Sequence, residues 1–326
     1  MENKYKAPMS SNRKPLHTLL PLDAPLSLFI DPSDICNFKC EFCFQHHINY
    51  SGQIMDKSLF EKIINDMKEF DSPFKMVHLN GFGEPLINPA IFDFIRILKE
   101  ENVAEIVSIT TNASLLDKEK AEKLISAGLD KIHISIYALE DEGYFKFSNA
   151  KVSFNNIYEN IKYLYSIKSK CHIHIKIAGD YFSDQEKKHF LNLFESISDT
   201  MFIDSAINAW PGLKVVDDTQ NHMYGMGNEN RICPMPFYQL VIHSNGKISP
   251  CCNEYQQKLI VGDIYKDSLK EIWNGEKINK LRRNILKNTI PQKCVCNYCE
   301  YPKCGATVDI TPYRDMLLPF YEEEIK

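Results

Sequence analysis

Eleven cysteines, ten of them in two groups, constrain this chain more strongly than any other feature of its 326 residues. The first group is Cys36, Cys40 and Cys43, and the second occupies the last part of the chain, at positions 233, 251, 252, 294, 296, 299 and 304. An odd number of cysteines leaves a thiol over after full pairing, and a reducing cytosol makes a disulfide framework a poor explanation. Two groups of thiols that lie about 190 residues apart instead predict two metal sites.

The composition is that of an ordinary globular protein, with 44% hydrophobic and 25% charged residues, which excludes global disorder. The 38 basic and 43 acidic residues give a net charge of −5, so no nucleic-acid partner is expected. No apolar run reaches the roughly 18–20 residues of a membrane span, and the polar start, MENKYKAPMSSNRK, lacks the apolar segment of a signal peptide. We therefore expect a cytoplasmic protein with no membrane partner.

Short β-type runs alternate with amphipathic helical patterns between residues 26 and 208. The expected strands are 26–31, 75–80, 105–110, 131–137, 171–178 and 201–207, and the expected helices are 56–70, 89–101, 117–127, 152–169 and 184–197. Asp117 and Ser153 are typical residues for the starts of two of these helices. Repeated βα units imply a parallel sheet with right-handed crossovers. Six units are too few for a closed eight-stranded barrel, so this α/β region is expected to form a partial (βα)6 TIM-like barrel.

The alternation within three of these strands predicts a polar barrel interior. In 171–178, His172, His174 and Lys176 share one face and three isoleucines share the other. Segments 131–137 and 75–80 show the same pattern. Because closed barrels usually fill their interior with branched apolar residues, a polar interior indicates a cavity for polar ligands. Histidines that are simply hydrogen-bonded within the core are the alternative.

The rest of the chain predicts an extension, a linker and a second domain. Residues 1–25 form an irregular N-terminal extension, 209–232 a linker, 233–311 a small α+β domain, and 312–326 a C-terminal tail or helix. Within the second domain, 236–250 predicts a β-hairpin with Asn245-Gly246 at its turn. Residues 266–288 are expected to be helical.

The first three cysteines follow the first strand, where loops of parallel α/β folds form active sites. Thiolates are preferred ligands of iron–sulfur clusters. Three ligands leave one iron of a four-iron cluster open for another molecule. A zinc site that is completed by His46 or His47 is the alternative.

The segment CNFKCEFCF at 36–44 resembles the signature of the radical S-adenosylmethionine (SAM) enzymes, including the aromatic Phe42 before the third cysteine. The family places a glycine-rich turn after the second strand to hold the methionine amino group of SAM. Here that turn is Gly81-Phe82-Gly83-Glu84, with phenylalanine where the family usually has glycine. The resemblance implies three further SAM contacts: Asn112 in the Thr111-Asn112 turn, Ser135 against the ribose, and Lys151 or Lys146 in place of an arginine for the carboxylate.

The late cysteines resemble the SPASM/twitch extension of the same family. Its pattern is met by Cys233, Gly246, Cys251 and the Cys296-x2-Cys299 pair, and 261–273 matches the usual intervening segment. The hairpin would bring Cys233 and Cys251 together at its base. The resemblance implies one auxiliary 4Fe–4S cluster, held by Cys233, Cys251, Cys296 and Cys299, and a zinc ion on the same thiols is the alternative. Cys252 is either an inert thiol or a hydrogen donor, and Cys171 and Cys304 are expected to be structural.

The resemblance implies SAM and two 4Fe–4S clusters as cofactors. The first cluster, reduced by an external donor such as flavodoxin or ferredoxin, would cleave SAM to a 5′-deoxyadenosyl radical. Similarity to the radical SAM aminocyclitol dehydrogenases implies oxidation of a small sugar- or cyclitol-like alcohol. The auxiliary cluster would accept an electron, and His172, His174 or Lys176 would act as the base. The alternatives are epimerisation with Cys252 as hydrogen donor, peptide maturation, and a non-catalytic zinc or iron–sulfur scaffold.

Overall fold

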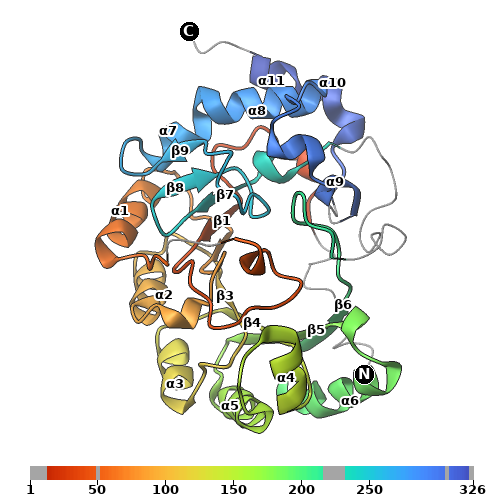
Figure 1. The fold of residues 1–326 in the computed structure, drawn as a ribbon. Coiled ribbons are helices and arrows are strands. Elements are labelled where there is room, and N and C mark those ends of the chain that lie inside the picture. The colour runs from red at the N-terminus through yellow and green to blue at the C-terminus, as the bar shows by residue number, and fades with distance from the viewer. Residues whose placement is uncertain (1–12, 49–51, 216–231, 305–307, 323–326) are drawn as a thin grey trace.

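The computed structural model describes residues 13–48, 52–215, 232–304 and 308–322. Within these ranges one sheet of nine strands runs through the molecule in the order β6-β5-β4-β3-β2-β1-β7-β8-β9 (Figure 1). The six parallel strands of the predicted barrel are β1 Ser27–Ile30, β2 Met76–His78, β3 Val107–Thr111, β4 Lys131–Ile136, β5 His172–Ala178 and β6 Thr200–Asp204. Because β6 is an edge of the sheet, the barrel is open and the predicted fold is confirmed.

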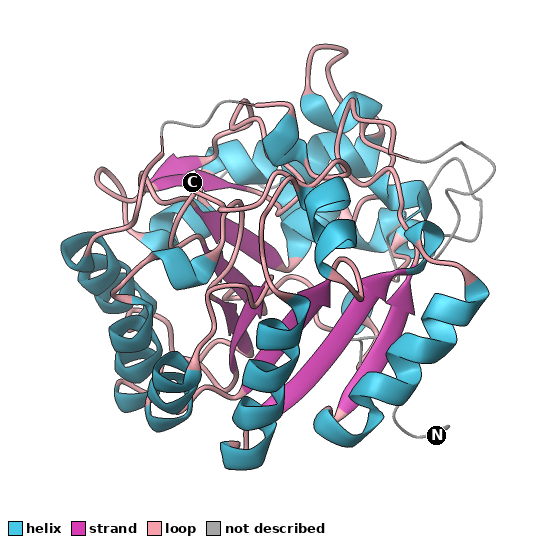
Figure 2. Cartoon of the chain, turned by 60° about the horizontal axis from the view of Figure 1, so that its bottom comes forward, coloured by secondary structure: helices cyan, strands magenta, loops and turns pink. Residues whose placement is uncertain are grey.

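Five helices follow the first five strands, as the sequence predicts, and cover the outer face of the sheet (Figure 2). They are α1 Lys57–Met67, α2 Ile91–Glu100, α3 Lys118–Ser126, α5 Phe154–Ile167 and α6 Asp184–Phe194. The side chains of Asp117 and Ser153 accept hydrogen bonds from the first turns of α3 and α5, which confirms both predicted helix starts. An additional helix, α4 Asp141–Ser148, was not predicted, and it ends at Asn149 in the left-handed conformation.

The apolar face of each alternating strand is buried, as predicted. Ile132, Ile134 and Ile136 of β4 and Ile173, Ile175 and Ile177 of β5 are at most 2% exposed. The opposite faces lie in register: His133 pairs with His174, which in turn pairs with Thr200. The rings of His133 and His174 are 5.2 Å apart. A row of polar side chains therefore crosses three neighbouring strands inside the barrel.

These interior histidines are held in their neutral form. Burial lowers the pKa of His174 to about 4, and burial together with the neighbouring histidines lowers the pKa of His133 to about 3. His78, on β2, has a pKa lowered to about 4 for the same reason, burial. Desolvation disfavours the charged imidazolium, so the folded protein binds fewer protons here than the unfolded chain does.

The predicted hairpin is present, and it extends the barrel sheet. Strand β7 Gln239–Ile242 pairs with β8 Lys247–Ser249 around Gly246, which has a positive φ of 79°, and β9 Gly262–Asp263 pairs with β8. Strand β7 also lies parallel to β1, with Leu28 opposite Leu240 and all of this pair buried. The sequence did not predict this pairing. It makes the second domain a continuation of the first domain's sheet.

The helical segment expected over 266–288 is divided into two helices. Helix α7 Leu269–Asn274 ends and α8 Glu276–Lys287 begins at Gly275, which has an extended ψ of 161°. A Cβ atom at Gly275 would lie 2.7 Å from the carbonyl oxygen of Glu271, so glycine permits the close approach at this corner. Shorter helices follow, at α9 Tyr301–Cys304, α10 Arg314–Leu317 and α11 Pro319–Glu322.

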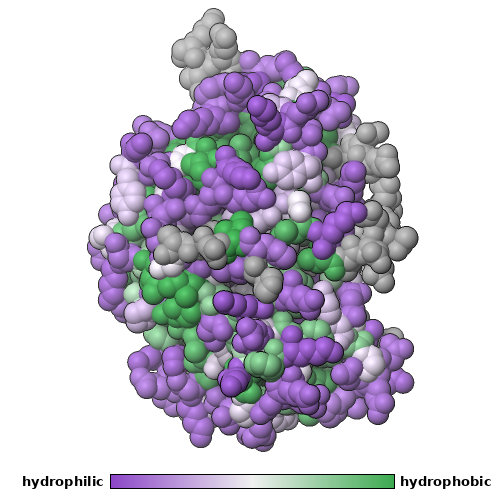
Figure 3. Space-filling view, in the orientation of Figure 1, coloured by the Kyte–Doolittle hydropathy of each residue, from purple (hydrophilic) through white to green (hydrophobic). Residues whose placement is uncertain are grey.

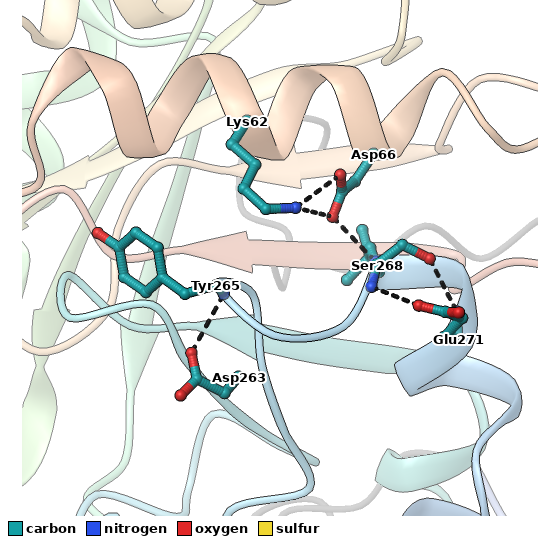
Figure 4. Close-up of polar contacts among 7 residues, drawn as sticks. Lys62, Asp66, Asp263, Tyr265, Ser268 and Glu271 are labelled. Atoms are coloured by element: carbon teal, nitrogen blue, oxygen red, sulfur yellow. Dashed lines mark hydrogen bonds and ion pairs between the residues drawn. The ribbon is translucent and has the colours of Figure 1, made fainter.

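Two further contacts join the beginning of the chain to its second half. The carboxylate of Asp66 on α1 accepts a hydrogen bond from the backbone of Leu269, at 3.1 Å, beside the Ser268–Glu271 capping box that starts α7 (Figure 4). In the N-terminal extension, Leu16 and Leu20 pack in the same apolar cluster as Phe237, which precedes β7, and as residues of α8 and the C-terminal segment. Leu16 and Leu20 are therefore part of the second domain's core.

Parts of the predicted organisation lie outside the described residues, namely 1–12 of the extension, 216–231 of the linker and 323–326 of the tail. Within the described ranges, no helix combines the length and apolarity that a membrane crossing requires. The face in Figure 3 is mostly hydrophilic, with smaller hydrophobic areas between.

The buried histidines predict how stability changes with pH in the metal-free protein. Below about pH 6.5 the unfolded chain gains protons that the folded state does not bind, so the free energy of unfolding should fall as pH is lowered. Replacing His133 with Gln removes one such group and should reduce the loss by up to about 1.4 kcal/mol per pH unit between pH 6 and 5. Urea unfolding of both proteins at several pH values measures the difference, and equal slopes would contradict the assignment.

Candidate functional site

The first three cysteines lie in the loop that leaves the C-terminal end of β1. Cys40 is buried, and Cys36 and Cys43 are partly buried. Burial is the main cause that raises the pKa of Cys36 to about 11, and a further cause is repulsion from the Cys43 thiolate. Burial and repulsion from the other two thiolates also raise the pKa of Cys40. Such a set of thiolates is unfavourable without compensating positive charge, which the iron ions of a cluster supply.

Three cysteine thiols are the donor set that an iron–sulfur cluster prefers. Among the described residues, no three His, Cys, Asp or Glu side chains are gathered closely enough to hold one metal ion. His47 is exposed, and the side chain of His46 lies outside the described part of the structure.

The Gly81–Glu84 turn is packed directly against the segment that leads into this loop. A Cβ at Gly83 would lie 2.3 Å from the carbonyl oxygens of Ser33 and Ile35, and a Cβ at Gly81 would lie 2.8 Å from Cγ of Asp31. A side chain at either position would collide with the neighbouring loop, so the packing of the two loops itself requires both glycines.

Glu84 joins this turn to the end of β3. Its Oε1 accepts hydrogen bonds from Thr111 Oγ1, at 2.6 Å, and from the backbone of Leu86, and its Oε2 accepts one from the backbone of Asn112, at 2.9 Å. Burial raises the pKa of Glu84 to about 7, against these three hydrogen bonds, which lower it. The Asn112 side chain in turn donates to Asn37, beside Cys36. The structure thus brings Glu84, Asn112 and the first cysteines together.

A cavity of about 300 Å³ opens at the C-terminal ends of β4, β5 and β6. Phe42, Ser135 and Lys176 line it, together with Tyr137, Tyr181 and Trp210 among others. Lys176 donates to Asp204 at 2.8 Å on the cavity wall. Lys151 and Lys146 are exposed and are not among the described residues that line the cavity. Two of the predicted SAM contacts are therefore together here, and the predicted carboxylate contact from a lysine at 146 or 151 is not.

The predicted base candidates occupy different depths of the barrel. Lys176 lines the cavity. His174 is two residues earlier in β5, on the same face of the strand, and is only 2% exposed. Its Nδ1 forms a hydrogen bond with Thr200 Oγ1 at 2.8 Å. Its Nε2 is buried without a hydrogen-bond partner among the described residues. His172 lies a further step down, and its Nε2 hydrogen-bonds to the same Thr200 at 2.9 Å.

Asp31 is a site residue that the sequence analysis missed. It directly follows β1 and is fully buried, and its Oδ1 accepts a hydrogen bond from the backbone of Phe82 at 3.1 Å. Burial raises its pKa to about 8. The sequence feature that could have indicated Asp31 is an acidic residue at the end of the apolar run LSLFID. By the alternation of a strand, Asp31 lies on the same face as Phe29.

The late cysteines surround one cavity of about 730 Å³. Cys233, Cys251, Cys296 and Cys299 all line it, which are the four that the SPASM/twitch resemblance assigns to one cluster. Burial is the main cause that raises the pKa of Cys233, Cys251 and Cys299, whereas a hydrogen bond with Cys294, followed by burial, raises that of Cys296. Cys252, Cys294 and Cys304 are described but are not among the lining residues. Four thiols around one cavity fit an iron–sulfur cluster by the chemistry of their donor atoms.

Cys252 lies at the start of β7, away from the mouth of the barrel. Burial raises its pKa, and the neighbouring side chain of Gln239, the first residue of β7, opposes this shift. Gln239 pairs with Ser27 at the beginning of β1, whereas Cys36, Cys40 and Cys43 follow the end of β1. The thiol of Cys252 donates to Asn253 Oδ1 at 3.6 Å.

Two family profiles match this sequence. Residues 30–194 match the radical SAM superfamily, and residues 233–300 match the SPASM iron–sulfur cluster-binding domain. Among curated proteins, the chain is 24% identical over 336 aligned positions to the tungsten-containing aldehyde ferredoxin oxidoreductase cofactor-modifying protein of Pyrococcus furiosus, covering 87% of this chain and 90% of the relative. It is 28% identical to the GTP 3′,8-cyclase of Staphylococcus haemolyticus, over 61% of this chain and only 60% of the cyclase.

Solved structures share the fold at low sequence identity. BtrN in complex with AdoMet and 2-DOIA has a TM-score of 0.52 at 18% identity, covering 79% of this chain and 86% of BtrN. Native anSMEcpe with bound AdoMet has a TM-score of 0.61 at 17% identity, covering 91% of this chain and 96% of that protein. Streptococcus suis SuiB bound to precursor peptide SuiA has a TM-score of 0.56 at 18% identity, covering 92% of this chain and 74% of SuiB.

The radical SAM profile extends over half of the chain, and the open barrel and the second cysteine domain agree with it in order and in place. The chain belongs to the radical SAM superfamily, as an enzyme with a C-terminal SPASM domain that binds SAM and two iron–sulfur clusters.

Proposed function

We propose that this radical SAM enzyme is a dehydrogenase that oxidises an alcohol of a small polar substrate, such as a sugar or an aminocyclitol. The observation that supports this most directly is that polar side chains of β4, β5 and β6 line the barrel interior of the same sheet that carries both cysteine sites, one after β1 and one at β7 and β8. When bound and reduced, the first cluster and SAM supply a 5′-deoxyadenosyl radical that removes a substrate hydrogen atom. Removal of a second electron and a proton then completes an oxidation.

In the proposed first site, Cys36, Cys40 and Cys43 are the cluster ligands and leave one iron open for SAM. The Gly81–Glu84 turn lies against the segment before these cysteines and would hold the methionine end of SAM. Phe42 and Ser135 face the cavity and would contact the adenosine end. Lys151 is not part of the proposed site.

In the proposed second site, Cys233, Cys251, Cys296 and Cys299 hold the cluster that accepts the electron. Strands β7 and β8 are antiparallel, so Cys251, which follows the end of β8, lies near Gln239 at the start of β7. Strand β7 is parallel to β1, and the other end of this strand pair leads into the loop of the first site. From Ser27 to Ile30 the strand rises by about 10 Å, at about 3.3 Å per residue. The two proposed cofactor sites would therefore lie at opposite ends of the same strand pair.

His174 is the proposed base among the three candidates. Burial lowers its pKa to about 4, which keeps it neutral at physiological pH and makes it a weak base without substrate. The buried Nε2 has a lone pair for a substrate proton in the tautomer whose Nδ1–H donates to Thr200 Oγ1. Lys176 already donates to Asp204. The hydroxyl of Thr200 contacts one ring nitrogen of His172 and one of His174, and so orients both rings.

Anaerobic reconstitution tests the proposed cofactor sites. The wild-type protein should bind about eight irons, as two four-iron clusters, and release 5′-deoxyadenosine from SAM with dithionite. Cys36→Ala should lose about half of the iron and all SAM cleavage, whereas Cys299→Ala should lose iron but still cleave SAM. Stoichiometric zinc with no SAM cleavage would contradict the proposal and favour a scaffold.

Replacing His174 with Gln tests the base. Oxidation should fall by roughly 10²–10⁴-fold, while 5′-deoxyadenosine formation continues, because hydrogen abstraction does not need the base. Mass spectrometry of a panel of aminocyclitols and amino sugars measures the loss of two hydrogens. His189→Gln, an exposed histidine on α6, is the control and should match wild type. Equal oxidation by His174→Gln would overturn its role, and modification of a supplied peptide instead would favour a maturase.

Cys252 separates the dehydrogenase from an epimerase. Its position beside Gln239 places it in the second domain rather than at the cavity mouth. Cys252→Ala should therefore keep both SAM cleavage and oxidation. Selective loss of product with continued 5′-deoxyadenosine formation, and inversion of a substrate carbon by wild type, would favour epimerisation.

A further inference from the structure

Phe82 replaces a glycine in the turn that the family uses for SAM, and its ring is buried. The side chain is 4% exposed, and its ring lies 4.8 Å from that of His243 and 5.1 Å from that of Phe44. Its backbone is held from the barrel side, because the N–H donates to Asp31 and the carbonyl accepts a hydrogen bond from Gln45. The residue is therefore held by the barrel through its backbone and by the second domain through its ring.

His243 continues this contact into the second domain. It directly follows β7, is fully buried, and hydrogen-bonds through Nε2 to Ser249 Oγ at 2.6 Å. Ser249 Oγ donates to Glu254 Oε2 at 3.3 Å, and the backbone of Glu254 donates to the carbonyl of Cys251. A continuous set of buried contacts thus runs from the proposed SAM turn to a cysteine of the second cavity.

A second set of contacts joins the same two regions. Tyr255 follows Glu254, and its ring lies 5.1 Å from that of Phe44, the residue after Cys43. Trp210, on the cavity wall, has its ring 4.5 Å from Phe44, and Tyr255 donates a hydrogen bond to the carbonyl of Pro211 at 3.0 Å. Tyr255, at the end of the 251–255 turn, therefore packs on Phe44 of the first cysteine loop and bonds to Pro211 beside the wall of the 300 Å³ cavity.

We propose that Phe82 is a positioning residue through which the auxiliary site sets the affinity of the first site for SAM. A cluster held by Cys251 and its three partners fixes the 251–255 turn, and the turn fixes His243 and Phe44 against Phe82. Loss of that cluster frees these contacts and so weakens SAM binding. The coupling is reciprocal, since two ligands that bias the same contacts change each other's affinity by the same factor.

The inference rests on the proposed function, because it needs both cluster sites. The test is the dissociation constant of SAM, measured by anaerobic equilibrium dialysis without substrate. In the wild-type background, Cys299→Ala should weaken SAM binding by at least about fivefold. In a Phe82→Gly background, the same change should weaken it by less than about twofold, since the link is already absent. Phe82→Leu, which keeps apolar bulk, should restore part of the dependence.

Two controls keep the test decisive. Cys304→Ala removes a buried thiol of the same domain that is not among the described lining residues of the four-cysteine cavity, and it should leave the SAM dissociation constant unchanged. If Cys299→Ala also loses the first cluster, His243→Leu is used in its place, because this variant keeps every cysteine. Its effect on SAM binding should then be strongly non-additive with that of Phe82→Gly.

The outcomes distinguish the two claims. Wild-type protein that binds no SAM would overturn the proposed function. Wild-type protein that binds SAM, but loses the same factor on Cys299→Ala in both backgrounds, would overturn only the coupling through Phe82. Additive effects of His243→Leu and Phe82→Gly would do the same. A red shift of Trp210 emission in Cys299→Ala, absent in Cys304→Ala, is the expected spectroscopic sign of the loosened cavity wall.

Discussion

The parallel pairing of β1 with β7 is the contact on which the rest of this structure depends. It adds the hairpin of the second domain to the open edge of the barrel and buries Leu28, Ile30, Leu240 and Ile242 completely. Because β1 leads into the first cysteine loop and β7 begins beside Cys251, one strand pair sets the relative position of both cysteine sites. The proposed transfer of an electron to the second site would need such a connection, because the rate of electron transfer depends on distance.

Close packing of loops determines the first site before any cofactor binds. The Gly81–Glu84 turn has no space for side chains at its glycines, and Glu84 is fully engaged with Thr111, Asn112 and Leu86. Three neighbouring thiolates, of which that of Cys40 is buried, are electrostatically unfavourable alone, so iron binding and local stability are linked. Phe82 stands where the family usually has glycine. Its ring fits because it packs against His243 and Phe44, away from the close backbone contacts of Gly81 and Gly83.

Much of this arrangement could be predicted from the sequence because the signals are local. The alternation of Ile173, Ile175 and Ile177 with polar residues, the caps of α3 and α5, and Asn245-Gly246 all act within a few residues. The β1–β7 pairing could not be predicted, because it joins two short apolar strands more than 200 residues apart. Asp31 was missed for a similar reason: its burial depends on the Gly81 turn that packs over it. The break at Gly275 and helix α4 depend on tertiary packing that overrides local propensity.

The central claim is that the first cluster keeps one iron for SAM. Electron paramagnetic resonance of the dithionite-reduced Cys299→Ala variant, which isolates this cluster, tests it most directly. The account predicts a four-iron signal whose g-values change when SAM is added and do not change with S-adenosylhomocysteine at the same concentration. A signal that SAM leaves unchanged, or a cluster whose fourth iron is already bound by a protein side chain, would contradict it.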